Sequence, residues 1–157
     1  MGDDQEITLT HVADSGLNLK HVGTGDGKMP TFTLQCGDNN MEADDKLGVI
    51  NFQAPDEGAG TDAILVAAGI EAVSEGDFSA SNNATKLSLK TAASEAATEK
   101  LAISSGGDVK VVTDGASMFF GADSEIELRH VAAEGLILKH VGTGDGKMPT
   151  MTFQAGD

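Results

Sequence analysis

The sequence predicts an all-β fold made of elongated repeat modules, each built from short antiparallel strands and hairpins. Short runs rich in Ile, Val, Leu and Thr alternate apolar with polar residues, which is the period-2 pattern of a strand with one buried face. Clusters of Gly, Asp, Ser and Asn separate these runs, as turns do. The chain also repeats itself, because residues 6–38 match residues 125–157 at 25 of 33 positions.

This repetition divides the chain, with an offset of 119 residues between the copies. We expect a first hairpin module over residues 1–38, a central β module over 39–115 and a second hairpin module over 116–157. A recurring segment usually marks a unit that stacks on or pairs with its copies. Two explanations remain open: the chain is one period of a longer tandem array, or both ends of a subunit bind at equivalent positions in a fibre.

Each copy is predicted to begin with a hairpin. Apolar positions alternate with polar ones on both sides of the turn VADSG: Ile7, Leu9 and His11, then Leu17 and Leu19. A loop over residues 12–16 sets Leu9 opposite Leu19 and His11 opposite Leu17, so that both apolar sets share one face. A loop of even length would turn one set to the other face. We therefore predict an odd-length loop in which Gly16 takes a positive φ.

The same pattern recurs in the second copy, where Ile126 and Leu128 of the first strand are predicted to share a face with Leu136 and Leu138 of the second. A third strand is predicted after the glycine-rich turn, because the apolar Phe32 and Leu34 alternate with Thr and Gln.

The central module is predicted to contain further short strands, in KLGVINFQAP, DAILVAAGIEAVSE, ATKLSLKT, EKLAISS and DVKVVT. Turn residues separate them in DEGAGT, EGDFSASNN, SSGGD and TDGA. AASEAATEK is the only helical candidate. A helix of that length does not offset its nucleation cost, so we expect a loop with at most one helical turn.

The repeated residues KHVGTGDGKMPT, at 20–31 and 139–150, suggest a phosphate-binding loop at first. The P-loop pattern G-x-x-x-x-G-K-[ST] fails, because Met29 follows Lys28 and Val22 stands five positions before Gly27. Gly-Asp-Gly instead predicts a turn. Since this turn recurs once per period, we expect its residues to make the same assembly contact in each copy: Lys20, His21, Gly23, Gly25, Asp26, Gly27 and Lys28, and Lys139, His140, Gly142, Gly144, Asp145, Gly146 and Lys147.

Composition indicates a chain that needs neighbours. It has six Phe and no Trp or Tyr, while Ala and Gly are abundant, so little apolar area per residue can be removed from water. A net charge of −15 argues against nucleic acid and anionic membranes as partners. The single cysteine, Cys36, is replaced by Ala155 in the second copy, and no disulfide framework exists. The longest apolar run, AILVAAGI, is far shorter than the roughly 20 residues of a membrane span, so membrane insertion is not expected.

The four histidines, His11, His21, His130 and His140, suggest a metal site, because a threefold axis would bring three copies of each imidazole together. No His-x-His, Cys-x-x-Cys or His-Glu-x-x-His spacing occurs, and a hydrogen-bonded or partly buried strand histidine is the favoured interpretation.

A structural calcium site is a second candidate, at the turn carboxylates Asp3, Asp4, Asp26, Asp44, Asp45 and Asp145. The calcium-loop pattern is missing, so solvated turn carboxylates are favoured and no cofactor is expected. With no positioned nucleophile, such as G-x-S-x-G, the chain is not expected to be an enzyme.

A resemblance covers nearly the whole chain. The pattern LGxIxFxAxDxG is met by Leu47, Gly48, Ile50, Phe52, Ala54, Asp56 and Gly58; an Ile-x-Ala strand follows at Ile70 and Ala72, then KLSLKT at 86–91, then Glu95 and residues 99–106. Together with EITLTHVADSGLNLKHVGTGDGK and ASMFFGADSEIELRHV, these stretches resemble repeated modules of tail-fibre and other virion appendage proteins of tailed bacteriophages, particularly those of marine bacteria. The resemblance implies an intertwined trimeric β-fibre or prism, located in an extracellular virion appendage. It implies no catalytic motif.

The leading hypothesis is therefore a structural shaft or spacer module of a phage tail fibre, whose partner is itself. One alternative is a receptor-binding adhesin that recognises a host cell-surface glycan through its Asp- and Asn-rich loops. The chain lacks the Trp and Tyr on which sugar-binding sites generally depend, which favours shaft over tip. A second alternative is an extracellular filament subunit that polymerises head to tail through the twin segments.

Overall fold

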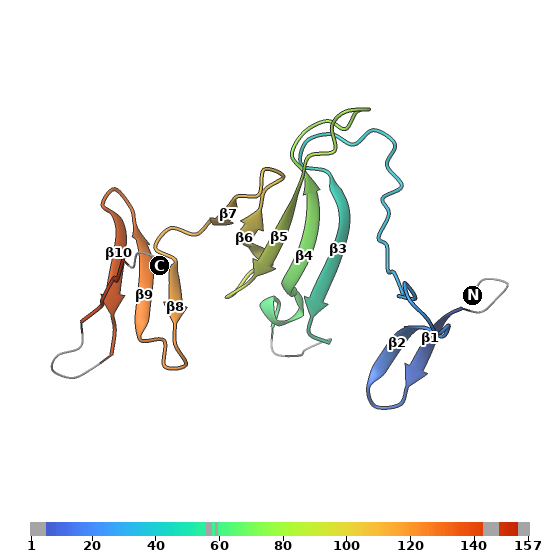
Figure 1. Ribbon diagram of the computed structural model, residues 1–157, viewed down its shortest axis with the longest axis horizontal. Coiled ribbons are helices and arrows are strands. Elements are labelled where there is room, and N and C mark those ends of the chain that lie inside the picture. The colour runs from blue at the N-terminus through green and yellow to red at the C-terminus, as the bar shows by residue number, and fades with distance from the viewer. Residues whose placement is uncertain (1–5, 56–57, 59, 143–147, 154–157) are drawn as a thin grey trace. The chain divides into compact units, whose positions relative to one another are not determined.

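The computed structural model describes residues 6–55, 58, 60–142 and 148–153. Over these residues the chain is all-β, with three antiparallel sheets of two, five and three strands, none of them closed (Figure 1). The predicted fold class of short antiparallel strands and hairpins is confirmed at this level.

The chain divides into two units, Met1–Gln35 and Cys36–Asp157. Each of the three predicted modules contains one sheet, and the second unit contains two of them. The first unit contains β1 (Ile7–Val12) and β2 (Gly16–His21). The second contains β3 (Lys46–Gln53), the 3-10 turn η1 (Asp62–Ile64), β4 (Val66–Ser74), β5 (Thr85–Thr91), β6 (Thr98–Ile103), β7 (Val109–Val111), β8 (Ser117–Phe120), β9 (Ile126–Val131) and β10 (Gly135–His140).

The first hairpin has the predicted register. Leu9 lies opposite Leu19, and His11 lies opposite Leu17, so the apolar side chains of β1 and β2 share one face. The last pair of the ladder joins Val12 to Gly16, which leaves an odd loop of three residues between them. Gly16 has φ +117°, as predicted.

The second hairpin repeats this geometry in β9 and β10. Leu128 lies opposite Leu138, and the glycine that begins β10, Gly135, also has φ +117°. Asp14 and Ala133, which occupy equivalent loop positions, have φ 60° and 62°. The five differences between the two hairpins therefore leave their register and loop conformation unchanged.

The predicted third strand after the glycine-rich turn is wrong. Residues 31–35 form no strand, although Phe32 and Leu34 alternate with polar residues as a strand would. The third strand of the second copy is β8, which precedes the hairpin and pairs with β9, Met118 lying opposite Leu128. Alternation gives a segment one apolar face but supplies no backbone partner, and a strand needs both.

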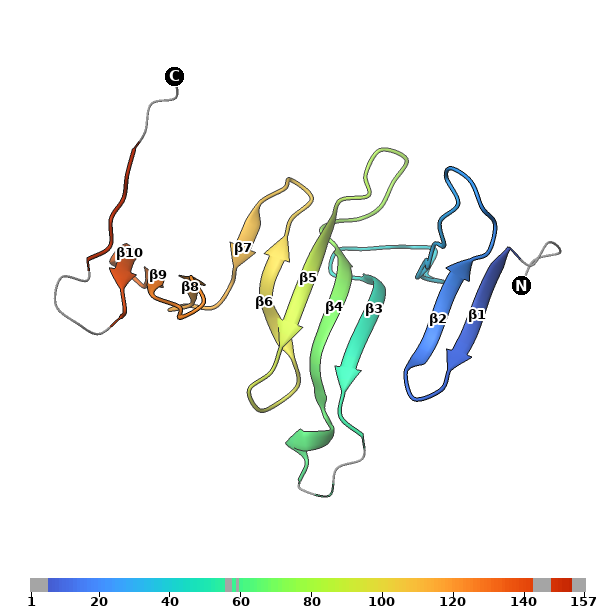
Figure 2. The same ribbon diagram turned by 60° about the horizontal axis from the view of Figure 1, so that its bottom comes forward.

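The five strands predicted in the central module form one meander in the order β3-β4-β5-β6-β7, and Figure 2 shows them side by side. The helical candidate is a loop, with β6 beginning at Thr98. Register sets one apolar row across all five strands: Ile50, Ile70, Leu89, Leu101 and Val111. The 3-10 turn before β4 was not anticipated.

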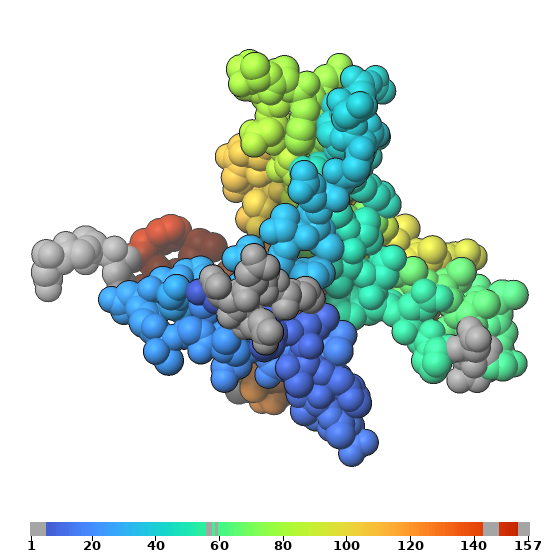
Figure 3. Space-filling model, turned by 90° about the vertical axis from the view of Figure 1, so that its right-hand side faces the viewer, coloured from blue at the N-terminus to red at the C-terminus, as the bar shows by residue number. Residues whose placement is uncertain are grey.

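At one end of this sheet, two connections lie side by side (Figure 3). The segment before β3 accepts a backbone hydrogen bond from the β4–β5 connection, from the Phe78 amide to the Met41 carbonyl at 2.9 Å, and donates one to the last residue of β4, from the Asp44 amide to the Ser74 carbonyl at 3.0 Å. The Ser74 hydroxyl, which is buried, donates a further hydrogen bond to the Glu42 carbonyl. These bonds hold the β4–β5 connection in place.

Candidate assembly surfaces

One face of the five-stranded sheet, the apolar sheet face, is built from three rows of paired residues. The central row is the one from Ile50 to Val111; a second runs from Gly48 through Ala72, Leu87 and Ile103 to Val109, and a third contains Phe52, Ala68, Thr91 and Thr98. None of these described, paired positions carries a charge. Nevertheless, six large side chains on this face are exposed, from 42% for Ile103 to 67% for Val109, while Ile70, Leu89 and Leu101 are half-buried.

The opposite face, the charged sheet face, holds what this sheet buries. Val73 and Ala102 are buried there, as are Glu71 and Ser88. Of the described residues, only Val73, Ala97 and Ala102 are buried hydrophobic residues. The sheet therefore shields its polar side and leaves its apolar side to water, the reverse of what a self-sufficient sheet requires.

Glu71 anchors the charged sheet face. Its Oε1 accepts hydrogen bonds from Lys90 Nζ at 2.7 Å and Lys46 Nζ at 2.9 Å. Burial acts most strongly on this carboxyl and raises its pKa, but the hydrogen bonds and charges of Lys90 and Lys46 together outweigh burial, so the pKa of Glu71 lies below its usual value. Three strands are thereby joined through one carboxylate.

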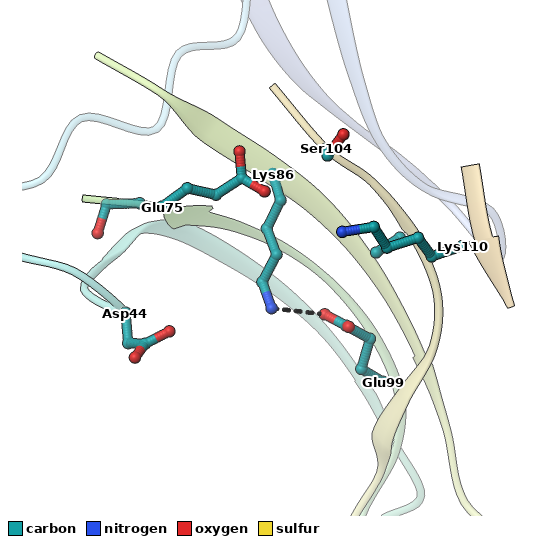
Figure 4. Close-up of a pocket in the computed structure, with 8 residues that line it drawn as sticks. Asp44, Glu75, Lys86, Glu99, Ser104 and Lys110 are labelled. Carbon is teal, nitrogen blue, oxygen red and sulfur yellow. Dashed lines mark ion pairs between the residues drawn. The ribbon is translucent and has the colours of Figure 1, made fainter. Parts of the chain in front are cut away.

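A polar pocket of about 310 Å³ lies on the same face (Figure 4). Lys86 reaches across it to Glu99, with Nζ and Oε2 3.1 Å apart. Burial again raises the pKa of Glu99, but the hydrogen bond from Ser88 and the bond and charge of Lys86 bring it below the usual value. At the rim, hydrogen bonds from the hydroxyl and the amide of Ser105 lower the pKa of Glu75.

This pocket was not predicted, although a signal for it exists. Lys86, Lys90 and Glu71 occupy polar positions of period-2 strands, so their presence on one face follows once the strand order is known. Glu99 joins them because the β5–β6 register shifts between Leu89 and Lys90, which alternation does not reveal. Near neutrality the Glu75 and Glu99 carboxylates are ionised, which suits them to accept hydrogen bonds from hydroxyl or ammonium groups rather than to donate protons.

The residues predicted to make an assembly contact at the repeated turns lie partly within and partly outside the described residues. In the first copy, the imidazole Nδ1 of His21 accepts a hydrogen bond from the Gly23 amide at 3.1 Å. Gly25 and Gly27 have positive φ, and Lys28 Nζ lies 3.9 Å from Glu6 Oε1 at an exposed site. Lys20 lies in β2 opposite Thr8, and Asp26 is exposed in the turn.

The second copy repeats the histidine contact, with the Gly142 amide donating to His140 Nδ1 at 3.0 Å. Lys139 pairs with Glu127 in the β9–β10 ladder. A Cβ on Gly142 would lie 2.5 Å from His140 Cε1, and one on Gly23 would lie 2.9 Å from His21 Cε1, so each glycine makes room for its histidine ring. Gly144, Asp145, Gly146 and Lys147 lie outside the described residues.

The described candidates for metal binding form no cluster within a single chain. In the part of the chain that the structure describes, no three His, Cys, Asp or Glu side chains are placed to hold an ion. His130 Nδ1 lies 3.7 Å from Asp114 Oδ1, and Asp45 accepts a hydrogen bond from the Glu42 amide at 2.7 Å. Asp44 lines the polar pocket, His11 is exposed in β1, and Asp3, Asp4 and Asp145 lie outside the described residues.

A second apolar surface lies on the first hairpin. We define the hairpin face as the six positions 7, 9, 11, 17, 19 and 21, and their equivalents at 126, 128, 130, 136, 138 and 140. In the first copy the four aliphatic side chains of this face and residues 31–33 line a groove of about 590 Å³. Leu17 is 73% exposed there, and its equivalent, Leu136, is 68% exposed.

Within the described residues, no helix is long and apolar enough to cross a membrane. Comparisons with protein-family models, with curated proteins and with solved structures found no match to this chain.

Proposed function

We propose that this chain is a structural shaft or spacer module, which assembles through packing of β-sheets between copies and provides length and assembly rather than catalysis. The observation that carries the proposal is the uncovered apolar sheet face. It combines rows of aliphatic side chains with an absence of charge at its paired, described positions. Exposed apolar patches of this kind mark interaction surfaces.

The favoured assembly is a trimer, in which three apolar sheet faces surround a common axis. Burying an Ile, Leu, Val or Phe side chain is worth about 1.5–3 kcal/mol, so covering several half-exposed ones on each chain offers enough free energy to oppose the cost of association. The charges of the sheet lie on the other face, where a chain of net charge −15 can keep them in solvent. Residues of modest size suit a narrow axial core.

The sequence motifs that resemble those of tailed-phage fibre modules support the same role, and would place the assembly in an extracellular virion appendage. The duplicated ends support a repeating object. Nucleic acid and lipid are poor partners for so acidic a chain.

The experiment is to add a charge to the apolar sheet face and measure the assembly state. Ile50→Asp and Val111→Asp alter exposed side chains, so each chain keeps its own sheet. Asn51→Asp is the matched control, since it puts the same charge on the opposite face of β3. Light scattering should give trimers or larger species built from trimers for the unaltered chain and the control, and loss of the threefold association for both variants. A monomeric unaltered chain, with no rods by electron microscopy, would overturn the proposal.

A glycan-binding adhesin is the second candidate, and the ordered β4–β5 connection favours it. Asn82 Nδ2 donates to the Asp77 carbonyl at 2.7 Å, and Ser79 and Asn82 form a β-bridge, so this Asn-rich loop is held in shape beside the pocket residue Glu75. A glycan array hit that is abolished by Asn82→Ala, but is unchanged by substitutions in the glycine turns, would support this role.

A further inference from the structure

Outside their loops, the two copies of the hairpin differ only on one face. Over the strands β1 and β2 there are three substitutions, Thr8 to Glu127, Thr10 to Arg129 and Asn18 to Ile137. All three lie on the side opposite the hairpin face, as the ladder pairs Thr10 with Asn18 and Leu9 with Leu19. The six positions of the hairpin face are identical in both copies: Ile, Leu, His, Leu, Leu and His.

This difference between the faces indicates a contact. The opposite face tolerates changes of charge and size: Thr8 becomes Glu127, which is buried and accepts a hydrogen bond from the Ser117 hydroxyl, and Thr10 becomes the exposed Arg129. The hairpin face has kept its side chains even though Leu17 and Leu136 are more than two-thirds exposed. The histidine contacts with Gly23 and Gly142 account for His21 and His140, but intrachain packing gives no reason for the constancy of Leu17 and Leu136, whereas a surface that meets the same partner in both copies does.

Charge points to the identity of that partner. No position of the hairpin face is acidic, although the chain has 25 Asp and Glu residues. Two such faces can approach without bringing carboxylates together, and the four aliphatic side chains of one can cover those of the other. The groove beside Leu9 and Leu19, about 590 Å³ in volume, can receive side chains from the facing hairpin.

We propose that the hairpin face of the first copy in one chain packs against the hairpin face of the second copy in another chain, and so joins copies of this chain end to end. This inference rests on the proposed structural role. It names the contact through which such modules would join lengthwise. The contact differs from the one expected at the glycine turns, because it is made by the strands.

Leu17→Asp and Leu136→Asp test the contact at equivalent, highly exposed positions. Asn18→Asp and Ile137→Asp are matched controls one residue along, on the opposite face. Electron microscopy should show long particles for the unaltered chain and both controls. The double variant Leu17→Asp/Leu136→Asp should give particles of one chain's length with an unchanged number of chains across. Unaltered length in the double variant would overturn the contact, as would an unaltered chain that forms single-length particles only. Loss of lateral assembly by Ile50→Asp would report separately on the proposed function.

Cross-linking makes the test independent of folding defects in the charged variants. Leu17→Cys and Leu136→Cys are introduced into separate, differently tagged chains that also carry Cys36→Ala, a change that the second copy already contains as Ala155. Mild oxidation should enrich the mixed disulfide at least several-fold over mixtures with Asn18→Cys. Equal yields would overturn the proposal. A disulfide that forms within one monomeric chain carrying both cysteines, and not between chains, would also overturn it.

Discussion

Glu71 accepts hydrogen bonds from Lys90 and Lys46 through a single carboxylate oxygen, at 2.7 and 2.9 Å, and thereby ties β3 and β5 to the strand between them. The side chain of Glu71 is 8% exposed and that of Lys90 is 21% exposed, so this is the most shielded ion pair on the sheet.

Replacing this carboxylate should destabilise the central sheet. Glu71→Gln leaves two ammonium groups facing a neutral amide, and hydrogen bonds to charged groups are worth about 1.5–3 kcal/mol. We expect a loss of about 2 kcal/mol in the free energy of unfolding, measured by urea denaturation. Asp108→Asn, at an exposed turn, removes the same charge and should change that free energy by less than about 0.5 kcal/mol. Equal effects from both variants would show that the ion pair adds nothing beyond net charge.

Acid should weaken the same sheet. The pKa values of Glu71 and Glu99 lie below the ordinary value of 4.5 in the folded chain, so their contribution to stability is complete above about pH 4.5 and is lost as the pH falls through the lower folded values. The urea midpoint should therefore fall on acidification below about pH 4.5, more steeply for the unaltered chain than for Glu71→Gln. Parallel curves for the two proteins would contradict the assignment, since relief of general repulsion among carboxylates affects both.

The loop of the second hairpin should gain stability from glycine. Ala133 has φ 62°, a conformation that costs an L-residue with a Cβ roughly 1–2 kcal/mol, while Asp14 at the equivalent position belongs to a residue type that tolerates it. Ala133→Gly should slow hydrogen exchange at the Glu134 amide, which bonds to the Val131 carbonyl, by about fivefold or more. The converse change, Asp14→Ala, should speed exchange at Ser15. No change in either hairpin would mean that the loop does not limit its opening.

The histidine contact in the glycine turns should behave as one unit. His21→Ala removes the acceptor of the Gly23 amide, and Gly23→Ala pushes the ring away with its new Cβ. Either change should speed exchange at the amide of residue 23 by about fivefold, as loss of a bond worth about 1 kcal/mol requires. The double variant should be no faster than either single one. His11→Ala, on the same face without such a bond, serves as the control, and additive effects would contradict the coupling.

Much of the fold was accessible from local pattern. The pairing of Leu9 with Leu19 followed from the loop length alone, since only a loop with an odd number of residues keeps both side chains on one face. The five central strands followed from alternation and turn residues. The strand predicted at 31–35 failed because alternation cannot reveal whether a neighbouring backbone edge exists. The helical candidate was correctly reduced to a loop by its length.

The charged sheet face was missed for a related reason. Glu71 stands between Ile70 and Ala72 in the sequence and carries no motif, and its partners come from strands before and after it. Only the order of strands brings Lys46 and Lys90 to the same carboxylate. The histidine of the turn was correctly expected to be hydrogen-bonded, but its partner, the amide two residues on, was not named.

Every ladder in the described structure joins strands that are consecutive in the chain, from β1 with β2 to β9 with β10. Sheets of this kind require only short loop closures, which makes them fast to form. Each can take shape as its residues leave the ribosome, before any sister chain is within reach. Synthesis would then release preformed sheets that each expose one apolar face. The concentration of nascent chains in the cell would determine whether these sheets associate with copies of the same chain or with other proteins.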